Sequence, residues 1–135
     1  MKPMSDAEAN KFSGILKEYL HQLEQGNVDG VVSLFSTDAR IYSPLLGWVT
    51  PRPFYSKLAD ASGNSSITLL DIFQSTQGNR TANAYFRYDW VLRDGSKVRF
   101  DCVDVFDFNA QGLIEKLVII YDTHQIRADL GDRFV

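Results

Sequence analysis

The spacing of hydrophobic positions along the chain changes near Ser65. Before this point, apolar residues recur three and four positions apart, which is the spacing of one face of an α-helix. After it, apolar and polar residues alternate, which is the spacing of β-strands. Helices in the first half and strands in the second predict an α+β domain, in which the helices cover one face of an antiparallel sheet.

The first predicted helix is the longest. Ser5 and Glu8 have the spacing of a capping box, and Gly26 is a typical residue just beyond a helix end. Between them runs one apolar stripe of about five turns, made of Phe12, Ile15, Leu16, Tyr19, Leu20 and Leu23. This long helix is expected to cover the sheet.

Two shorter helices and two short strands are expected next. Asn27 can cap a helix within 28–35, and Thr50 followed by a proline can start another over 51–61. Short strands or a hairpin are expected within 37–44 and 45–51.

Four long strands complete the predicted domain. They cover residues 66–76, 81–92, 96–108 and 113–122, separated by turn-forming residues. The tail, residues 124–135, is expected to form a short helical turn. A chain of 135 residues with 44% hydrophobic residues suits one domain over residues 1–135.

Composition argues against several classes of function. The net charge is −3 without a basic run, so nucleic acid is not expected as a partner. One cysteine and two histidines cannot form a Cys/His zinc site, and no metal is expected. No glycine-rich phosphate loop is present, so no cofactor is expected. Without a signal segment or an apolar run of membrane-spanning length, we expect a cytoplasmic protein that does not bind membranes.

Asp104 stands out in the third long strand. The alternation places it on the same face as four apolar residues, Phe100, Cys102, Phe106 and Phe108. A bulge could turn it to solvent, but the two phenylalanines that follow in phase favour burial. A buried carboxyl group must be neutral or paired, so Asp104 is a candidate pocket residue.

The length of the loop around Asp94 and Gly95 determines which residues of the preceding strand lie on the same face as Asp104. A two-residue loop pairs Arg93 with Ser96 and brings Tyr85, Arg87 and Asp89 to the face of Asp104. Another loop length reverses the strand, so that Phe86, Tyr88 and Trp90 line the pocket and Arg87 is a surface residue. The two-residue loop is favoured.

The favoured register also predicts an apolar outer face of the sheet. That face would carry Phe86, Tyr88, Trp90, Val103 and Val105. A surface of this kind is typical of a protein interface, so a homodimer through the outer sheet face is expected.

The order of these elements resembles the nuclear transport factor two-like superfamily, above all its SnoaL-like members and the ketosteroid isomerases. The resemblance covers nearly the whole chain and is carried by YLHQLEQGNVDGVVSLFSTDARIYSP and DVFDFNAQGLIEKLVIIYD. It implies a cone, in which a curved antiparallel sheet wraps around a long N-terminal helix with two further short helices. One pocket lies inside the cone.

The resemblance also implies roles for three positions. In ketosteroid isomerases a tyrosine and a protonated aspartic acid bind an oxyanion, and an aspartate is the base. Tyr19, seven residues before Gly26, matches the tyrosine, and Asp104 matches the protonated acid. Ser43 occupies the place of the base. A serine without a basic neighbour cannot remove a proton from carbon near neutral pH.

Three functional hypotheses follow. The first is an isomerase or cyclase for a hydrophobic carbonyl compound, with Tyr19 and Asp104 as oxygen-polarising groups and Asp89 as the candidate base. The second is a non-catalytic ligand-binding or dimerisation module with a buried pair of Arg87 and Asp104. The third is an epoxide-hydrolase-like enzyme with an Asp–Arg–Asp arrangement of Asp89, Arg87 and Asp104.

The expected partner is a small hydrophobic molecule in the pocket. The residues expected to contact it come from several elements: Ser43, Trp48, Phe54, Tyr85, Arg87, Phe106, Leu117 and Tyr121.

Overall fold

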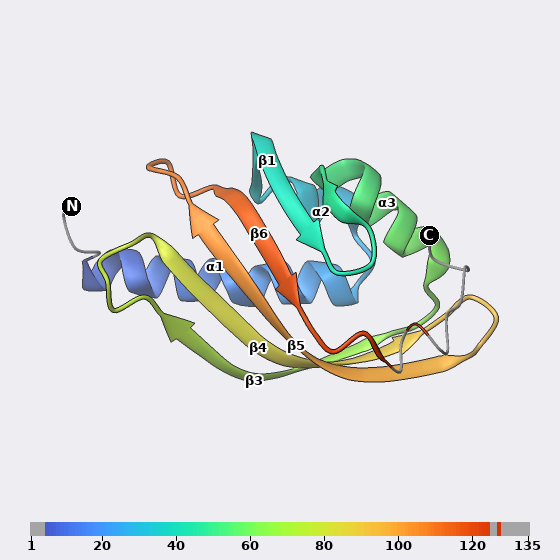
Figure 1. Cartoon of the computed structure of the whole chain (residues 1–135). Coiled ribbons are helices and arrows are strands. Elements are labelled where there is room, and N and C mark those ends of the chain that lie inside the picture. The colour runs from blue at the N-terminus through green and yellow to red at the C-terminus, as the bar shows by residue number, and fades with distance from the viewer. Residues whose placement is uncertain (1–4, 125–126, 128–135) are drawn as a thin grey trace.

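The computed structural model describes residues 5–124 and 127. Its helices are α1 (Asp6–Glu24), α2 (Val28–Val32) and α3 (Pro51–Ala61), and its strands are β1 (Phe35–Ser43), β2 (Gly47–Val49), β3 (Ser66–Gln74), β4 (Thr81–Val91), β5 (Lys97–Phe108) and β6 (Ile114–Ile120) (Figure 1). The predicted α+β class is confirmed. The helical turn expected within 124–135 falls almost entirely outside the described residues.

The six strands form one curved, open sheet in the order β2-β1-β6-β5-β4-β3. All neighbouring pairs are antiparallel except β1 and β6, which are parallel. Helix α1 runs across one face of the sheet, and α2 and α3 lie together at one end (Figure 1). This arrangement is the cone that was predicted, with its interior between α1, α3 and the sheet.

Helix α1 begins and packs as its sequence predicts. The Glu8 amide donates to the Ser5 hydroxyl at 3.1 Å, which completes one half of the capping box. Four residues of the apolar stripe are buried and Ile15 and Leu23 are half-buried, and the ring of Phe12 stacks on Phe108 with 4.2 Å between ring centroids. Most of the stability of a helix in a protein comes from the packing of its apolar face and not from intrinsic helix propensity. The stripe of α1 has this role.

The β4–β5 hairpin has a three-residue loop, not the two-residue loop that was favoured. Leu92 donates its backbone N–H to the Ser96 carbonyl at 2.8 Å, which leaves Arg93, Asp94 and Gly95 as the loop. Gly95 has φ +88°, the left-handed conformation that ends three-residue hairpin loops. The Asp94 carboxylate accepts the Ser96 N–H at 2.9 Å and braces this turn.

The extra loop residue shifts the register by one position and reverses both faces of β4. Phe86 pairs with Cys102, and Ala84 pairs with Asp104. The side chains of Phe86, Tyr88 and Trp90 are therefore buried in the cone, whereas the three residues expected there lie on the outer face: Tyr85, Arg87 and Asp89. The predicted outer face is therefore wrong for Phe86, Tyr88 and Trp90, whereas Val103 and Val105 do lie on that face.

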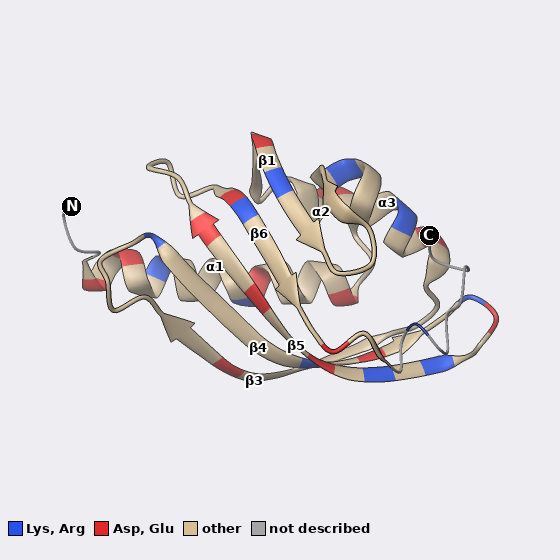
Figure 2. Ribbon diagram, in the orientation of Figure 1, with Lys and Arg blue, Asp and Glu red and all other residues tan. Residues whose placement is uncertain are grey.

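Acidic and basic residues are mixed along the β4–β5 hairpin and do not gather by sign (Figure 2). Arg87 pairs with Asp101 at 2.9 Å and Asp89 pairs with Arg99 at 2.6 Å, all four on the outer face. Within the described ranges, no helix is long and apolar enough to cross a membrane.

The corrected register makes a prediction about stability. Phe86→Ala removes a buried ring and should lower the free energy of unfolding by about 3–5 kcal/mol. Arg87→Ala, one residue along the strand, removes an exposed ion pair and should change the stability little. Urea unfolding of both variants measures the difference, and equal losses would contradict the register.

Candidate functional site

The interior of the cone contains a small cavity of about 50 Å³. Aromatic rings form most of its wall: Phe54, Tyr55, Phe86, Tyr88, Trp90, Phe100 and Tyr121. The polar groups at its wall that bear on its chemistry are those of Tyr19, Ser43, Tyr55, Cys102 and Asp104. An apolar cavity with a few polar groups is the usual form of a small-molecule site.

Asp104 provides the carboxyl group of this cavity. It lies on β5 between Ala84 and Ile119 of the neighbouring strands, and its side chain is 2% exposed. Burial raises the pKa of Asp104 to about 7, and the Cys102 thiol and the Tyr19 hydroxyl oppose this rise. Near neutral pH the group therefore exists in both its neutral and its charged form.

The thiol of Cys102 contacts this carboxyl group directly. Its Sγ donates to Oδ1 of Asp104 at 3.0 Å. Burial, followed by the charge of Asp104, raises the pKa of Cys102 far above its ordinary value. The thiol therefore stays protonated, acting as a weak donor and not as a nucleophile. The sequence indicated only that Cys102 was packed in the core.

Two tyrosines meet at the same wall. The hydroxyl groups of Tyr19 on α1 and Tyr55 on α3 are 2.5 Å apart, and both rings are buried. Loss of hydration raises the pKa of each well above the ordinary tyrosine value, so both remain neutral. Tyr19 stands where it was expected, and its ring packs edge-on against Phe106 at 4.9 Å.

Tyr55 was missed by the sequence analysis. Its helix has apolar residues at Pro51, Phe54 and Leu58, which are four, one and three positions away from it. That spacing places Tyr55 on the buried face of α3 and could have identified it. Its partnership with Tyr19 depends on how α1 and α3 pack, which the spacing does not encode.

Ser43 occupies the position of the catalytic base of ketosteroid isomerases, and here its hydroxyl group stabilises a turn. It is buried, and its hydroxyl oxygen accepts the backbone N–H groups of Leu45 at 3.2 Å and Leu46 at 3.3 Å. This is a turn-stabilising arrangement. The cavity wall offers Ser43 no basic side chain, so the hydroxyl cannot act as a base.

The other expected contact residues divide into two groups. Phe54 and Tyr121 line the cavity. Phe106 and Leu117 face the same side of the sheet and are fully buried, without forming part of the cavity wall. Trp48 is 53% exposed on β2 and lies beside Tyr42, so its expected place at the pocket is wrong.

The reversed faces of β4 correct three further assignments. Tyr85, Arg87 and Asp89 point away from the cavity because the three-residue loop shifts their register. Arg87 forms its ion pair with Asp101, so a buried pair with Asp104 does not exist. The Asp–Arg–Asp arrangement is absent as well, and Asp89 cannot serve as the base in the cavity.

One carboxylic acid therefore remains at the described cavity wall, that of Asp104. Among the residues that the structure describes, no three His, Cys, Asp or Glu side chains are grouped closely enough to hold a metal ion. The arrangement combines a carboxyl group that titrates near neutral pH with the hydroxyls of Tyr19 and Tyr55. It can donate hydrogen bonds to an oxygen atom of a bound molecule.

The raised pKa of Asp104 predicts a pH-dependent stability. The folded state holds its proton up to about pH 7 and the unfolded state only to about pH 4, so this group favours folding at low pH. Between pH 4.5 and 7.5 the wild type should lose about 3 kcal/mol of unfolding free energy from this group. Asp104→Asn should remove that loss. Denaturant titrations across this range test it, and parallel curves for both proteins would refute the assignment.

Several solved structures have the same fold, and the similarity extends over most of this chain. One is the epoxide hydrolase/cyclase-like enzyme SalBIII of pyran ring formation in salinomycin, with 20% identity, a TM-score of 0.74, and coverage of 88% of this chain and 95% of that one. Another is an NTF2-like protein of unknown function from Exiguobacterium, with 20% identity, a TM-score of 0.70, and coverage of 80% of this chain and 98% of that one.

A third is a hypothetical protein from Catenulispora acidiphila with a ketosteroid isomerase-like fold, in complex with trimethylamine. It has 12% identity, a TM-score of 0.73, and coverage of 87% of this chain and 92% of that one. At these identities the likeness shows the fold alone. No curated protein matches the chain. The family model of the SnoaL-like domain matches residues 16–117, which is most of the chain, and the protein therefore belongs to the SnoaL-like domain family.

Proposed function

We propose that the inner cavity binds the carbonyl end of a small hydrophobic molecule and that Asp104 acts on its oxygen as an acid. The fully buried carboxyl group of Asp104 among aromatic rings carries this proposal. In its neutral form the group donates a hydrogen bond, and a site shielded from water strengthens that bond. The rings supply the apolar surface that a hydrophobic ligand covers.

Tyr19 and Tyr55 extend the donor set. When Tyr55 donates its proton to the Tyr19 oxygen, the Tyr19 hydroxyl is left free to donate to Asp104 or to the ligand. Such a chain of donors stabilises negative charge that develops on a carbonyl oxygen during reaction. The arrangement corresponds to the oxyanion-binding half of an isomerase site.

The reaction that fits this site is an isomerisation or cyclisation that needs a single acid–base group. In a cyclisation, Asp104 gives its proton to the carbonyl oxygen while a hydroxyl group of the same substrate attacks the carbonyl carbon. The proton released by that hydroxyl restores Asp104, so the carboxyl group is unchanged after each turnover. A pKa of about 7 suits a group that must both give and take a proton near neutral pH. The shared fold with a cyclase-like enzyme supports this reaction class.

Binding of a carbonyl compound should depend on the protonation of Asp104. A carbonyl oxygen only accepts hydrogen bonds, so the affinity for 4-methoxyacetophenone should be constant below pH 6 and fall about tenfold per unit above pH 7. Calorimetric titration at pH 5.5 to 8.5 measures this. The ligand 4-ethylanisole, which lacks the carbonyl oxygen, is the control and should show no such dependence.

Variants of Asp104 separate hydrogen bonding from shape. Asp104→Asn keeps an N–H donor at every pH, so its binding of 4-methoxyacetophenone should be independent of pH. Asp104→Leu loses the carboxyl donor and should bind that ligand more weakly than the wild type does at pH 5.5, without dependence on pH. Unaltered pH dependence in Asp104→Asn would show that another group controls binding.

We also propose that the chain forms a homodimer through the outer sheet face. Of the residues expected on this face, Val103 and Val105 carry this proposal, and the others that carry it come from β1, β2 and β6. An apolar row crosses four strands in register: Trp48, Tyr42, Val118 and Val105. Beside it, Ile120 lies opposite Val103 and is 52% exposed. Apolar side chains gathered in this way favour contact with another protein surface.

The dimer proposal predicts the mass of the protein in solution. The wild type should have the mass of two chains in light scattering after gel filtration. Ile120→Asp places a charge within the proposed interface, and because Ile120 is exposed in the single chain, the variant should fold and have the mass of one chain. Leu113→Asp, another exposed apolar position in a turn outside that face, is the control and should remain dimeric. A wild type with the mass of one chain would refute the proposal.

A further inference from the structure

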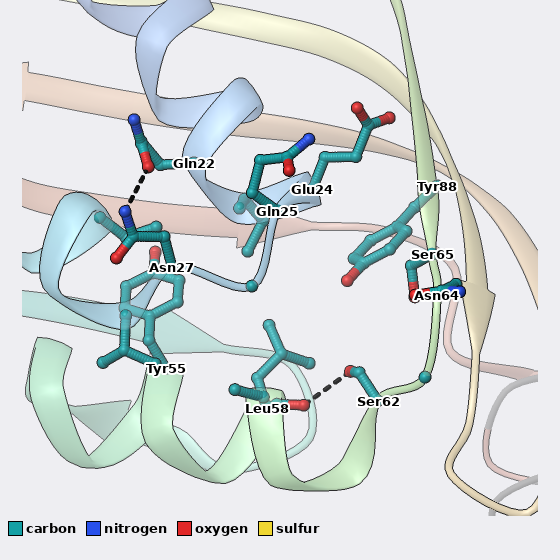
Figure 3. Close-up of a pocket in the computed structure, with 16 residues that line it drawn as sticks. Gln22, Glu24, Gln25, Asn27, Tyr55, Leu58, Ser62, Asn64, Ser65 and Tyr88 are labelled. Carbon is teal, nitrogen blue, oxygen red and sulfur yellow. Dashed lines mark hydrogen bonds between the residues drawn. The ribbon is translucent and has the colours of Figure 1, made fainter.

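A second, larger pocket adjoins the inner cavity. It has a volume of about 310 Å³ and lies between the end of α1, helix α3 and the segment 62–65 (Figure 3). Figure 3 shows the side chains of Leu58 and Tyr88 directed into this space, with Gln22, Glu24 and Gln25 of the end of α1 at its border. We call it the outer pocket.

Four side chains line both the outer pocket and the inner cavity: Leu23, Tyr55, Leu58 and Tyr88. They form a partition between the two spaces. Tyr88 lines the outer pocket together with Ser62 and Ser65, and Ser62 accepts the Trp90 indole N–H at 2.8 Å. The partition therefore consists of two leucine side chains and two tyrosines, and the hydroxyl group of Tyr55 is held by its contact with Tyr19.

The sizes of the two spaces limit what each can hold. A space of about 50 Å³ is well below the ~150 Å³ cavity that accommodates a benzene ring. The inner cavity can therefore receive only the end of a ligand, such as a carbonyl group and its nearest carbons. Sites for small molecules are commonly about 300–1,000 Å³, a range that the outer pocket reaches.

The lining of the outer pocket differs from that of the cavity. Its polar side chains are amides and hydroxyls, from Gln22, Gln25, Asn27, Ser62, Asn64 and Ser65. Glu24 is its one charged residue, and a carboxylate oxygen of Glu24 already accepts the Ile67 N–H at 2.7 Å. No lysine or arginine belongs to this lining, so an anionic group would meet an acid without a balancing cation.

Two of these amides are free to contact a ligand. The structure shows no hydrogen bond from the side chains of Gln25 or Asn64 within its described residues, whereas Gln22 accepts from the Asn27 amide at 2.8 Å. Amide groups donate and accept hydrogen bonds at once, which matches the hydroxyl groups of a sugar or polyol.

We infer that the outer pocket and the inner cavity are two parts of one ligand site. The outer pocket binds an uncharged, hydroxyl-bearing portion of the ligand, of sugar or polyol type, while the carbonyl end passes the partition to Asp104. This inference rests on the proposed function for the carbonyl end and adds the chemical class of the rest of the ligand.

Two matched probes test the inference at pH 6. One is 4-acetylphenyl β-D-glucopyranoside, which joins an acetophenone to a glucose unit, and the other is 4-methoxyacetophenone, which lacks the sugar. Calorimetry should show that the glucoside binds about tenfold more tightly to the wild type. The double variant Gln25→Ala and Asn64→Ala should lose this gain and bind the sugar-free probe as the wild type does.

A control variant and a blocking variant complete the experiment. Gln77→Ala with Asn79→Ala removes two exposed amides far from the outer pocket, and both probes should bind as they do to the wild type. Ala59→Trp fills the outer pocket from α3 and should abolish binding of the glucoside. Circular dichroism verifies that each variant is folded.

The outcomes distinguish the inference from the proposed function. Equal affinity of the two probes for the wild type, with pH-dependent binding of both, would overturn the inference and leave the carbonyl site intact. If the affinity for the glucoside depends on Gln25 and Asn64 but not on Asp104, the result would support the outer pocket as a binding site and refute the carbonyl site. Failure of both probes to bind would overturn both.

Discussion

Burial of the Asp104 carboxyl group is the constraint on which the site depends. A charged carboxylate without compensation is costly in an apolar interior, so the group is neutral or is supported by donors. The fold supplies weak donors, the Cys102 thiol and the Tyr19 hydroxyl, and no positive charge at the cavity wall. The pKa of Asp104 is consequently about 7, because burial raises it and these hydrogen bonds lower it.

One loop residue determines the surroundings of that carboxyl group. Because the β4–β5 loop has three residues, Phe86, Tyr88 and Trp90 surround the cavity and the charged side chains of β4 lie outside. With a two-residue loop, Arg87 would reach Asp104, and an ion pair would lower the pKa of that acid. The geometry of Gly95 thus contributes to the chemistry of a site that it does not touch.

The two neighbouring spaces have different chemistry because different elements form them. The sheet supplies four of the rings of the inner cavity and α3 adds Phe54 and Tyr55, whereas the end of α1 and the segment after α3 supply amides and hydroxyls of the outer pocket. A helix end naturally exposes polar groups, and a buried sheet face naturally presents apolar ones. A ligand that spans both would need an apolar end and a polar end.

Much of this protein could be predicted from its sequence, because the signals concerned are local. The capping box, the apolar stripe of α1 and the alternation around Asp104 depend on neighbouring residues, and they correctly indicated the helix, the α+β class and the burial of that acid. The family resemblance pointed to Tyr19 for similar reasons, since a short spacing to Gly26 carries it.

The tertiary structure decided what depends on pairing and packing. The register of β4 depended on a single loop residue, which the Asp94-Gly95 turn signal did not settle. The alternation within β4, with Phe86, Tyr88 and Trp90 on one face and charged residues on the other, was itself a signal for the buried face that the favoured loop length overrode. The meeting of Tyr19 with Tyr55 and the partition between the two spaces require α1, α3 and the sheet to be in place. The sequence by itself thus determined the elements and the buried acid, and only the packed structure determined its partners, because contacts between distant segments have no local periodicity.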